Sequence, residues 1–333
     1  MAVVATLAVS AGVPATGAAA TASTAKKSYN ITFVAALVND SYFVTIKCGA
    51  QAEAKKLGVN LNWTGPTSNS VSSELQAFNA ASLTNPQGMI LAPFSNTGFS
   101  GTVGPLMAKG VPVIASGESL SPPDALTTFI TNFLAGGNSL AGIIGKLTGG
   151  KGTMGIVADT TGNKTDSDRF TGLIPILHKK YPNLKVAGPE YGQNSSAKAA
   201  SVAAALISGN PDLKLLYAST GPEAVGVASA IAAAHETGKI KLISFDSSPP
   251  QIQLLKRHQL AATIAQSPFL DGELTVKTIV QYLNAHPHGG AVKASAKETY
   301  TPQKLLTPSN VTTKDALSYQ YLNNCSNAPK TTV

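Results

Sequence analysis

The chain has 333 residues, of which 43% are hydrophobic and 13% charged, and its formal net charge is +8. This length exceeds the size at which one hydrophobic core usually stops growing, so two domains are expected. The composition excludes an intrinsically disordered chain, which would have few apolar and many charged residues. The positive charge does not indicate nucleic-acid binding, because the lysines are scattered or stand where helices are expected to end, and no zinc-ligand spacing or arginine-rich arm is present.

Residues 1–28 are predicted to be a leader. The stretch MAVVATLAVSAGVPATGAAATASTA (1–25) contains no charge, and its short apolar run is followed by small residues with several A-x-A-like sites. This pattern is typical of a signal peptide, and it predicts an exported protein in the periplasm or at the extracellular face of the cytoplasmic membrane. A disordered alanine-rich leader is the alternative. Because no basic residue precedes Lys26, we expect the true start to lie upstream of the recorded one.

From Asn30 onward, short apolar or β-branched runs alternate with segments of helical periodicity. The runs that predict strands are residues 31–37, 59–63, 88–93, 111–116, 128–133, 152–158, 184–188, 213–219, 240–246 and 260–266. Alternation of strand and helix predicts βαβ units, and therefore parallel sheets with helices on both faces. The composition changes around residues 132–142, which favours two doubly wound α/β lobes over one wide sheet.

Polar and aromatic residues follow several of these runs, where open α/β sheets bind their ligands. The set comprises Asp40, Tyr42 and Phe43 after the first run, Gly117 and Glu118 after the fourth, and Thr220, Asp246 and Gln266 in the second half. Such a set of hydrogen-bonding groups and aromatic rings predicts a ligand-binding site. No Walker loop, strand-linked G-x-G-x-x-G or G-x-S-x-G elbow is present, so an enzyme is only the alternative class. We expect no cofactor, and the histidines of HPHGG (286–290) indicate a solvated turn more than a metal site.

Several segments together resemble the type 1 periplasmic solute-binding proteins of sugar ABC transporters, the ribose-binding-protein class. They are residues 31–61, VPVIAS (111–116), ISFDSSP (243–249) and LAATIAQSPFLDGELTVK (260–277). The likeness runs from about Tyr29 to Lys297, and it is best where the spacing of Asp246 and Gln266 is typical of the family. In addition, WTGPTSNSVSSEL (63–75) resembles a subgroup that binds autoinducer-2 or rhamnose-like ligands.

The resemblance implies two lobes joined by a three-segment hinge, which close over a sugar. The hinge crossings then fall near Asn132, Gln266 and residues 295–300. The implied divisions are an N-terminal lobe of residues 29–131 plus 267–297, a C-terminal lobe of residues 132–266 plus 298–318, and a tail of residues 319–333.

The resemblance also implies the ligand contacts. The polar residue after the first strand falls at Asp40, the stacking aromatics at Tyr42 and Phe43, and the contacts of the C-terminal lobe at Asp246 and Gln266. A sugar presents apolar C–H faces and a girdle of hydroxyls, so it needs flat rings for the faces and fixed polar groups for the edges. Phe43 is also in phase with a helical core stripe, so a packing role stays open, as does a turn-forming role for Asp246.

Other positions depart from the pattern of the ribose binders. Gly117-Glu118 replaces an Asp-Arg pair, Thr220 replaces an Asn, and Ser167 aligns with an Arg, whereas the next Arg of that segment is kept as Arg169. A ribose ligand is therefore not implied. Glu118 is predicted either to face the cleft, where it would accept hydrogen bonds from hydroxyls or attract a cationic substituent, or to be a solvated loop carboxylate.

The prediction for function is a monomeric, exported binding protein that delivers a monosaccharide or similar polyol to the permease of an ABC transporter. A chemotaxis or sensor ligand carrier would use the same cleft, and an autoinducer-2-like binder is a further alternative. A repressor of this architecture would need an N-terminal helix-turn-helix, whereas the leader occupies that place.

A disulfide between Cys48 and Cys325 is also predicted. These are the two cysteines of the chain, and the leader implies an oxidising compartment, in which an even number of cysteines favours pairing. At 100° per residue, Cys48 is expected to face solvent, roughly 160° from the middle of the helical core stripe. The chain-entropy relation gives about 4–5 kcal/mol for so long a loop. Two unpaired cysteines are the alternative.

Overall fold

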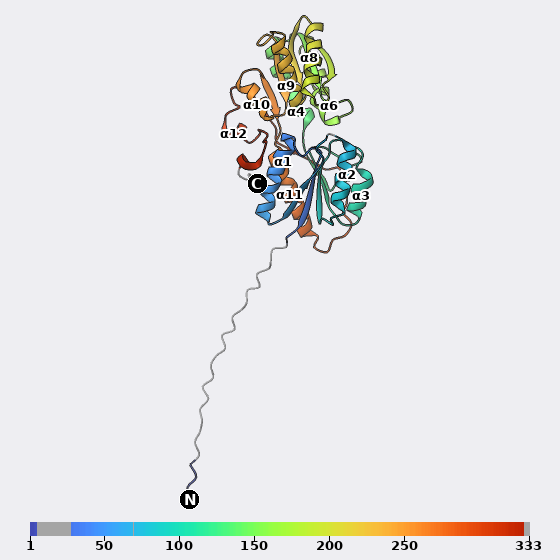
Figure 1. Ribbon diagram of the computed structural model, residues 1–333, viewed down its shortest axis with the longest axis vertical. Helices are drawn as coiled ribbons and strands as arrows, with labels where there is room; N and C mark the ends of the chain where they lie inside the picture. The colour runs from blue at the N-terminus through green and yellow to red at the C-terminus, as the bar shows by residue number, and fades with distance from the viewer. Residues whose placement is uncertain (5–27, 69, 330–333) are drawn as a thin grey trace.

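The computed structural model describes residues 1–4, 28–68 and 70–329, and the predicted leader lies almost wholly outside these residues. Two lobes are stacked along the long axis of the molecule, and each is built around a six-stranded sheet (Figure 1). The strand order is β11-β5-β4-β3-β1-β2 in the N-terminal lobe and β12-β10-β9-β8-β6-β7 in the C-terminal lobe. The predicted fold class, two doubly wound parallel-sheet lobes, is confirmed.

The sheet of the N-terminal lobe is parallel throughout. Its strands are β1 (Asn30–Ala35), β2 (Asn60–Thr64), β3 (Gly88–Ala92), β4 (Val113–Ser116), β5 (Thr127–Thr131) and β11 (Glu298–Thr301). Its helices are α1 (Ser41–Leu57), α2 (Val71–Ser82), α3 (Ser100–Ala108) and α11 (Pro268–Ala285). Strand residues alternate between the two faces, so one face packs on α1 and α11 and the other on α2 and α3.

Helices α1 and α11 approach each other very closely. A Cβ atom on Gly49 would lie 1.9 Å from the carbonyl oxygen of Phe269, and one on Gly272 would lie 2.1 Å from that of Ile46. Glycine at both positions therefore permits backbone-to-backbone contact, which fixes the first helix against the helix that follows the second hinge crossing.

The sheet of the C-terminal lobe is parallel except at its edge, where β12 pairs antiparallel with β10. Its strands are β6 (Lys151–Ala158), β7 (Asn183–Tyr191), β8 (Leu213–Ala218), β9 (Lys241–Phe245), β10 (Ala262–Ala265) and β12 (Lys304–Leu306). One face packs on α4 (Phe133–Ser139), α5 (Ala141–Thr148), α6 (Lys164–Thr171) and α7 (Leu173–Lys180). The other packs on α8 (Ser196–Gly209), α9 (Gly221–Ala233), α10 (Pro249–Lys256) and α12 (Lys314–Leu317).

All ten predicted strands are present, whereas β11 and β12 were missed. These two strands have four and three residues and lie at sheet edges. The sequence of β11 (ETYT) contains no apolar run, and that of β12 (KLL) is too short to form one, so only pairing with a neighbouring strand makes them β-structure.

The chain passes between the lobes after β5, after β10 and after β11. The position of the third crossing shows that one predicted boundary is wrong, namely the assignment of all residues 298–318 to the C-terminal lobe. Strand β11 instead pairs with β5 in the sheet of the N-terminal lobe, and only the segment from β12 onward belongs to the other lobe.

The predicted disulfide is present: Cys48 Sγ on α1 is bonded to Cys325 Sγ, in a short 3₁₀ turn (Cys325–Asn327). The expected exposure of Cys48 is wrong, since its side chain is only 2% exposed. Helical phase does turn it away from the lobe's core, but the C-terminal tail lies over that side of α1. No helix among the described residues has the length and apolar character to span a bilayer.

Candidate functional site

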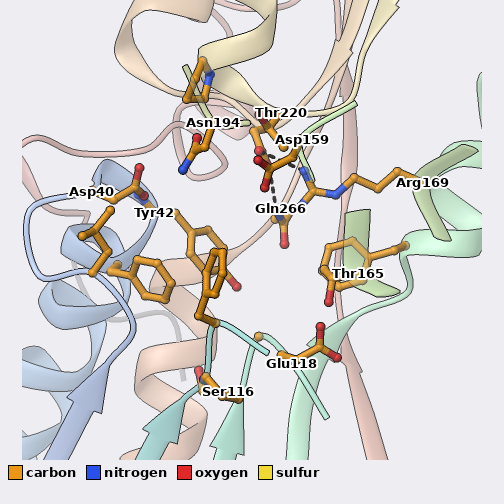
Figure 2. Close-up of a pocket in the computed structure, with 18 residues that line it drawn as sticks. Asp40, Tyr42, Ser116, Glu118, Asp159, Thr165, Arg169, Asn194, Thr220 and Gln266 are labelled. Carbon is orange, nitrogen blue, oxygen red and sulfur yellow. Dashed lines mark hydrogen bonds and ion pairs between the residues drawn. The ribbon is translucent and has the colours of Figure 1, made fainter. Parts of the chain in front are cut away.

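A cavity of about 150 Å³ lies between the lobes, at the carboxyl ends of strands from both sheets (Figure 2). The N-terminal lobe lines it with Leu37, Asp40, Tyr42, Phe43, Pro93, Phe94, Ser116, Gly117 and Glu118. The C-terminal lobe lines it with Phe133, Asp159, Thr165, Arg169, Asn194, Thr220, Pro222, Asp246 and Gln266. Its position agrees with the rule that open α/β sheets bind ligands beyond their strand ends.

The turn after β1 presents a carboxylate and two aromatic rings to this cavity. Asp40 caps α1, and its Oδ1 accepts a hydrogen bond of 2.8 Å from the backbone N–H of Tyr42. The first helical turn then carries the rings of Tyr42 and Phe43, which meet edge to face at 5.2 Å between centroids. Burial, and after it the Asp246 carboxylate, raises the pKa of Asp40.

Gly117 keeps the cavity open beside Tyr42. Its φ of 77° lies in the left-handed region, and a Cβ atom there would approach the Tyr42 hydroxyl to 2.7 Å. Both the backbone conformation and the close approach therefore require glycine at the end of β4.

Glu118 lines the cavity and is only 7% exposed, so the predicted alternative of a solvated loop carboxylate is wrong. One carboxylate oxygen accepts a hydrogen bond of 3.0 Å from the backbone N–H of Ser119. Burial raises the pKa of Glu118 to about 7, against the opposing effects of that hydrogen bond and of Lys164. The carboxyl group therefore titrates near neutral pH in the absence of a ligand.

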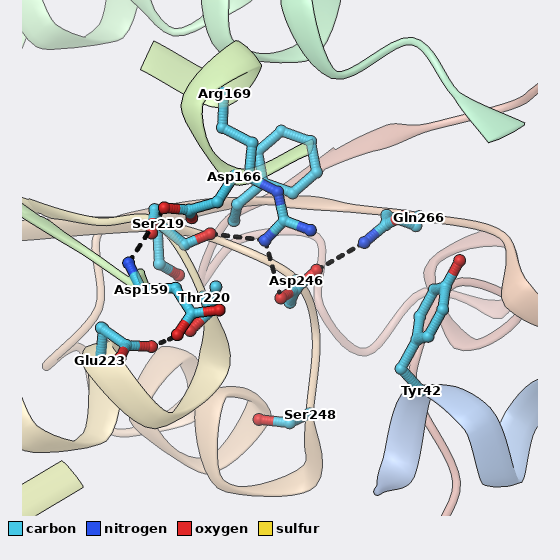
Figure 3. A network of polar contacts seen from close by, with 12 residues as sticks. Tyr42, Asp159, Asp166, Arg169, Ser219, Thr220, Glu223, Asp246, Ser248 and Gln266 are labelled. Atoms are coloured by element: carbon cyan, nitrogen blue, oxygen red, sulfur yellow. Dashed lines mark hydrogen bonds and ion pairs between the residues drawn. The ribbon is translucent and has the colours of Figure 1, made fainter. Parts of the chain in front are cut away.

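The centre of the opposite wall is an ion pair between Arg169 on α6 and Asp246 after β9 (Figure 3). Arg169 Nη1 lies 3.1 Å from Asp246 Oδ2 and donates a 2.6 Å hydrogen bond to the carbonyl of Ser219. The guanidinium carbon lies 5.0 Å from the ring centroid of Phe133 and 4.6 Å from that of Phe245. The Arg169 side chain is thus fixed by charge, hydrogen bonding and cation–π contact at once.

Gln266 completes this wall and connects it to the hinge. Its Nε2 donates a 2.6 Å hydrogen bond to Asp246 Oδ1, and its Oε1 accepts one of 2.9 Å from Thr131 Oγ1 on β5. Asp246 itself adopts φ 75°, a left-handed conformation that Asp tolerates better than most residues. Its carboxylate is aimed into the cavity by the backbone and held there by Arg169 and Gln266.

Two further carboxylates belong to this wall: Asp159 lines the cavity, whereas Asp166 does not. Asp166 Oδ2 accepts a 3.0 Å hydrogen bond from the backbone N–H of Asp159, and burial raises the pKa of Asp166 to about 6 in spite of the nearby guanidinium. Burial raises the pKa of Asp159 as well. The hydroxyl of Thr220 donates a hydrogen bond to the Glu223 carboxylate, and Thr220 also lines the cavity.

The structure brings together every predicted ligand-binding residue except Ser167. Ser167 lies on α6 two positions before Arg169, which is a rotation of about 200° around the helix. Its hydroxyl donates to the carbonyl of Lys164 instead of reaching the cavity. Thr165, four positions before Arg169, shares the face of Arg169 and lines the cavity in its place.

Sequence reasoning missed several lining residues. Asp159 directly follows β6, whose end at Ala158 the sequence predicts correctly, so the strand-end rule could have identified it. Asn194, in the turn between β7 and α8, and Phe133, at the start of α4, carry no comparable local signal. Within the described residues, no group of three or more His, Cys, Asp or Glu side chains is arranged to hold a metal ion.

The family model of the periplasmic binding protein domain matches residues 31–287. The chain belongs to this family. It is 27% identical to the D-allose-binding periplasmic protein of Escherichia coli (strain K12) over 252 residues, which are 73% of this chain and 81% of that protein. It is 26% identical to a ribose import binding protein of Bacillus subtilis (strain 168) over 283 residues, which are 85% of this chain and 88% of that protein.

Several solved structures share the fold. A solute-binding protein of Agrobacterium vitis, bound with alpha-D-tagatopyranose, superposes with a TM-score of 0.79 at 22% identity and covers 88% of this chain and 99% of its own. A carbohydrate transporter solute-binding protein of Agrobacterium radiobacter, in complex with D-arabinose, has a TM-score of 0.79 at 24% identity and covers 89% and 99%. The family predicted from the sequence is confirmed.

Proposed function

We propose that this protein captures a monosaccharide or similar polyol between its lobes and delivers it to the permease of an ABC transporter. The observation that carries the proposal is the cavity, in which the rings of Tyr42 and Phe43 share one space with the fixed polar groups of Asp246 and Gln266. Rings cover the C–H faces of a sugar, whereas carboxylates and amides pair with its hydroxyls. The site thus offers both kinds of contact that a sugar requires.

The names of the relatives support a monosaccharide. The curated relatives are named for allose and ribose, and the solved structures hold tagatose or arabinose. None of these names refers to autoinducer-2 or rhamnose, so they do not favour the subgroup suggested by residues 63–75. A sensor or chemotaxis carrier would use the same cavity, and no observation favours that role over transport.

We further propose that the protein acts as a monomer outside the cytoplasmic membrane and releases its sugar unchanged. Membership of a periplasmic family supports the location. The relatives are named as binding proteins, which supports binding without turnover. Incubation with the bound sugar followed by chromatography tests the last point, since any product would contradict it.

A thermal-shift screen tests the proposed function. D-allose, D-ribose, D-arabinose, D-tagatose and D-fucose are compared with L-leucine as a control ligand. A bound sugar at a hundred times its Kd stabilises the folded state by about 2.7 kcal/mol, and Tm rises by several degrees. If no small polyhydroxylated compound raises Tm, the proposed function is wrong.

A further inference from the structure

The C-terminal tail makes contacts with both lobes. On the C-terminal lobe, Ser247 Oγ donates a 2.5 Å hydrogen bond to the carbonyl of Tyr319, and the backbone N–H of Tyr321 donates one of 3.0 Å to the carbonyl of Ser247. One residue later the chain reaches the other lobe, where the N–H of Leu322 donates a 2.7 Å hydrogen bond to Thr45 Oγ1 on α1. The tail therefore spans the boundary between the lobes.

The tail also reaches the back of the ligand cavity. Tyr321 is 5% exposed, and its hydroxyl donates a 2.9 Å hydrogen bond to Asp246 Oδ1, the oxygen that also accepts from Gln266. The Tyr321 ring packs edge to face on Tyr42, with 5.6 Å between centroids. One tail residue thus contacts the central carboxylate of one cavity wall and the aromatic ring of the other.

The disulfide holds the tail in this place. Beyond Tyr321 the segment is mostly polar and exposed, and its non-covalent attachment to α1 depends largely on the Leu322 hydrogen bond. Such a segment detaches readily by local unfolding. The bond between Cys325 and Cys48 raises the effective concentration of Tyr321 at Asp246, because it fixes the far end of a segment whose near end is already held on Ser247.

We propose that residues 319–328 of the tail form a fourth connection between the lobes. The disulfide keeps the Tyr321 hydroxyl on Asp246 and so sets the affinity for the sugar. Tyr321 is a positioning residue that restrains the Asp246 carboxylate. While Tyr321 stays on Ser247, the residues from Leu322 to Cys325 span at most roughly 14 Å, so the disulfide also limits how far the lobes separate on that side. The statement on affinity rests on the proposed function, whereas the statement on lobe opening does not.

The first experiment compares Tyr321→Phe with Tyr319→Phe by calorimetry, using whichever of D-allose, D-ribose and D-arabinose gives the largest thermal shift. Tyr321→Phe keeps the ring against Tyr42 and removes only the hydroxyl. We expect its affinity to fall about fivefold to tenfold, which is less than the effect of losing a direct ligand hydrogen bond to a charged group, because Asp246 keeps Arg169 and Gln266 as partners. Tyr319→Phe, in the same tail, should bind as wild type. Wild-type affinity in Tyr321→Phe would overturn the positioning role.

The second experiment repeats both titrations after reduction of the native protein, with thiol titration to establish that the bond is broken. Reduction should lower the sugar affinity of wild type by a factor similar to the one that Tyr321→Phe causes. In the Tyr321→Phe variant, reduction should lower the affinity little further, because both changes act through the hydrogen bond between Tyr321 and Asp246. Unchanged affinity of the reduced wild type would show that the disulfide does not act on the site.

Small-angle X-ray scattering without sugar tests lobe opening independently of any ligand. The radius of gyration should increase on reduction and in Cys48→Ser/Cys325→Ser, because the lobes then separate further. Equal radii for the oxidised and reduced protein would overturn the fourth connection. If none of the sugars binds, the proposed function fails, and the scattering result still decides whether the tail restrains the lobes.

Discussion

The two lobes contribute different chemistry to the cavity. The N-terminal lobe offers mainly rings and backbone turns, namely Tyr42, Phe43, Phe94 and the Gly117 corner, with Asp40 and Glu118 at its edges. The C-terminal lobe offers a cross-linked polar wall, in which Arg169, Asp246 and Gln266 are joined by hydrogen bonds. One wall provides surface for stacking, and the other provides hydrogen bonds of fixed direction.

This difference indicates which wall is preorganised for a ligand. The Arg169 and Asp246 side chains are 8% and 14% exposed and are held by several hydrogen bonds, so little rotamer entropy remains to be lost on binding. In the N-terminal lobe, Asp40, Tyr42 and Phe43 are partly exposed and have fewer polar partners. We therefore expect specificity for hydroxyl positions to depend mainly on the C-terminal lobe, and general affinity for a sugar ring to depend on the N-terminal lobe.

The largest effect is expected for Arg169→Met. This change leaves Asp246 and the buried Asp166 without their cation, and removal of one partner of a buried ion pair costs about 3–5 kcal/mol. Urea unfolding should show this loss of stability, and calorimetry should show sugar affinity reduced by more than about a hundredfold. Lys164→Met is the matched control, because Lys164 pairs with Asp168 at the surface of the same helix and exposed pairs contribute less than about 1 kcal/mol. Equal stability of both variants would contradict the central role of Arg169.

A smaller loss is expected for Asp246→Ala. Asp246 would supply a charged acceptor to a ligand hydroxyl, and a hydrogen bond to a charged group contributes about 1.5–3 kcal/mol, which corresponds to a tenfold to hundredfold loss of affinity. Asp315→Ala, which removes a carboxylate paired with Lys304 outside the cavity, should bind normally. Calorimetry that gives Asp246→Ala the affinity of wild type would exclude this carboxylate from ligand contact.

The sequence predicted the layered fold well, because apolar runs and helical periodicity are local signals. The strand-end rule and the family resemblance together located nine of the eighteen residues that line the cavity. The prediction that Ser167 lines the cavity was wrong, because an alignment position was carried over without regard to helical phase. Ser167 lies about 200° around the helix from Arg169. That error was avoidable from the sequence.

Other features had no local signal. Arg169 and Asp246 are 77 residues apart, and only the packing of α6 against the end of β9 brings them together. The burial of Cys48 depends on a tail 277 residues away, and β11 and β12 depend on partners already in a sheet. Contacts between distant segments set these features, so periodicity within one segment could not reveal them.

A moderate effect is expected for Tyr42→Leu. We take the contact between the Tyr42 ring and the C–H face of a sugar to be as strong as a pair of aromatic rings, about 0.5–1.5 kcal/mol beyond the buried area. Loss of the ring should then weaken sugar binding roughly twofold to tenfold. Phe43→Leu is the informative neighbour. Both rings pack against the core of the N-terminal lobe, but Phe43 is the one in phase with the helical core stripe, so Phe43→Leu should lower the free energy of unfolding more than the affinity. Calorimetry and urea unfolding of both variants measure this, and Tyr42→Leu with wild-type affinity would contradict stacking on Tyr42.

The smallest effect is expected from the ionisation of Glu118. Burial raises its pKa from 4.5 to about 7, so the folded state without ligand holds more protons than the unfolded state between these values. The free energy of unfolding therefore decreases as pH rises from about 4.5 to about 7, and then levels off. At 1.36 kcal/mol per pKa unit the limit is about 3 kcal/mol for a cleft that stays closed, and hydration of the carboxylate on opening makes the decrease smaller.

Urea unfolding at several pH values measures this decrease as the difference between wild type and Glu118→Gln, which has no carboxyl group to titrate at this position. The stability of the two proteins should diverge between about pH 5 and pH 7, with wild type losing more as pH rises. Glu190→Gln, on the exposed side of β7, is the control for removal of one carboxylate from the surface. Parallel profiles for wild type and Glu118→Gln would show that Glu118 is hydrated in solution. The cleft would then be open without ligand, and the rings of the N-terminal lobe would meet the polar wall only when a sugar binds.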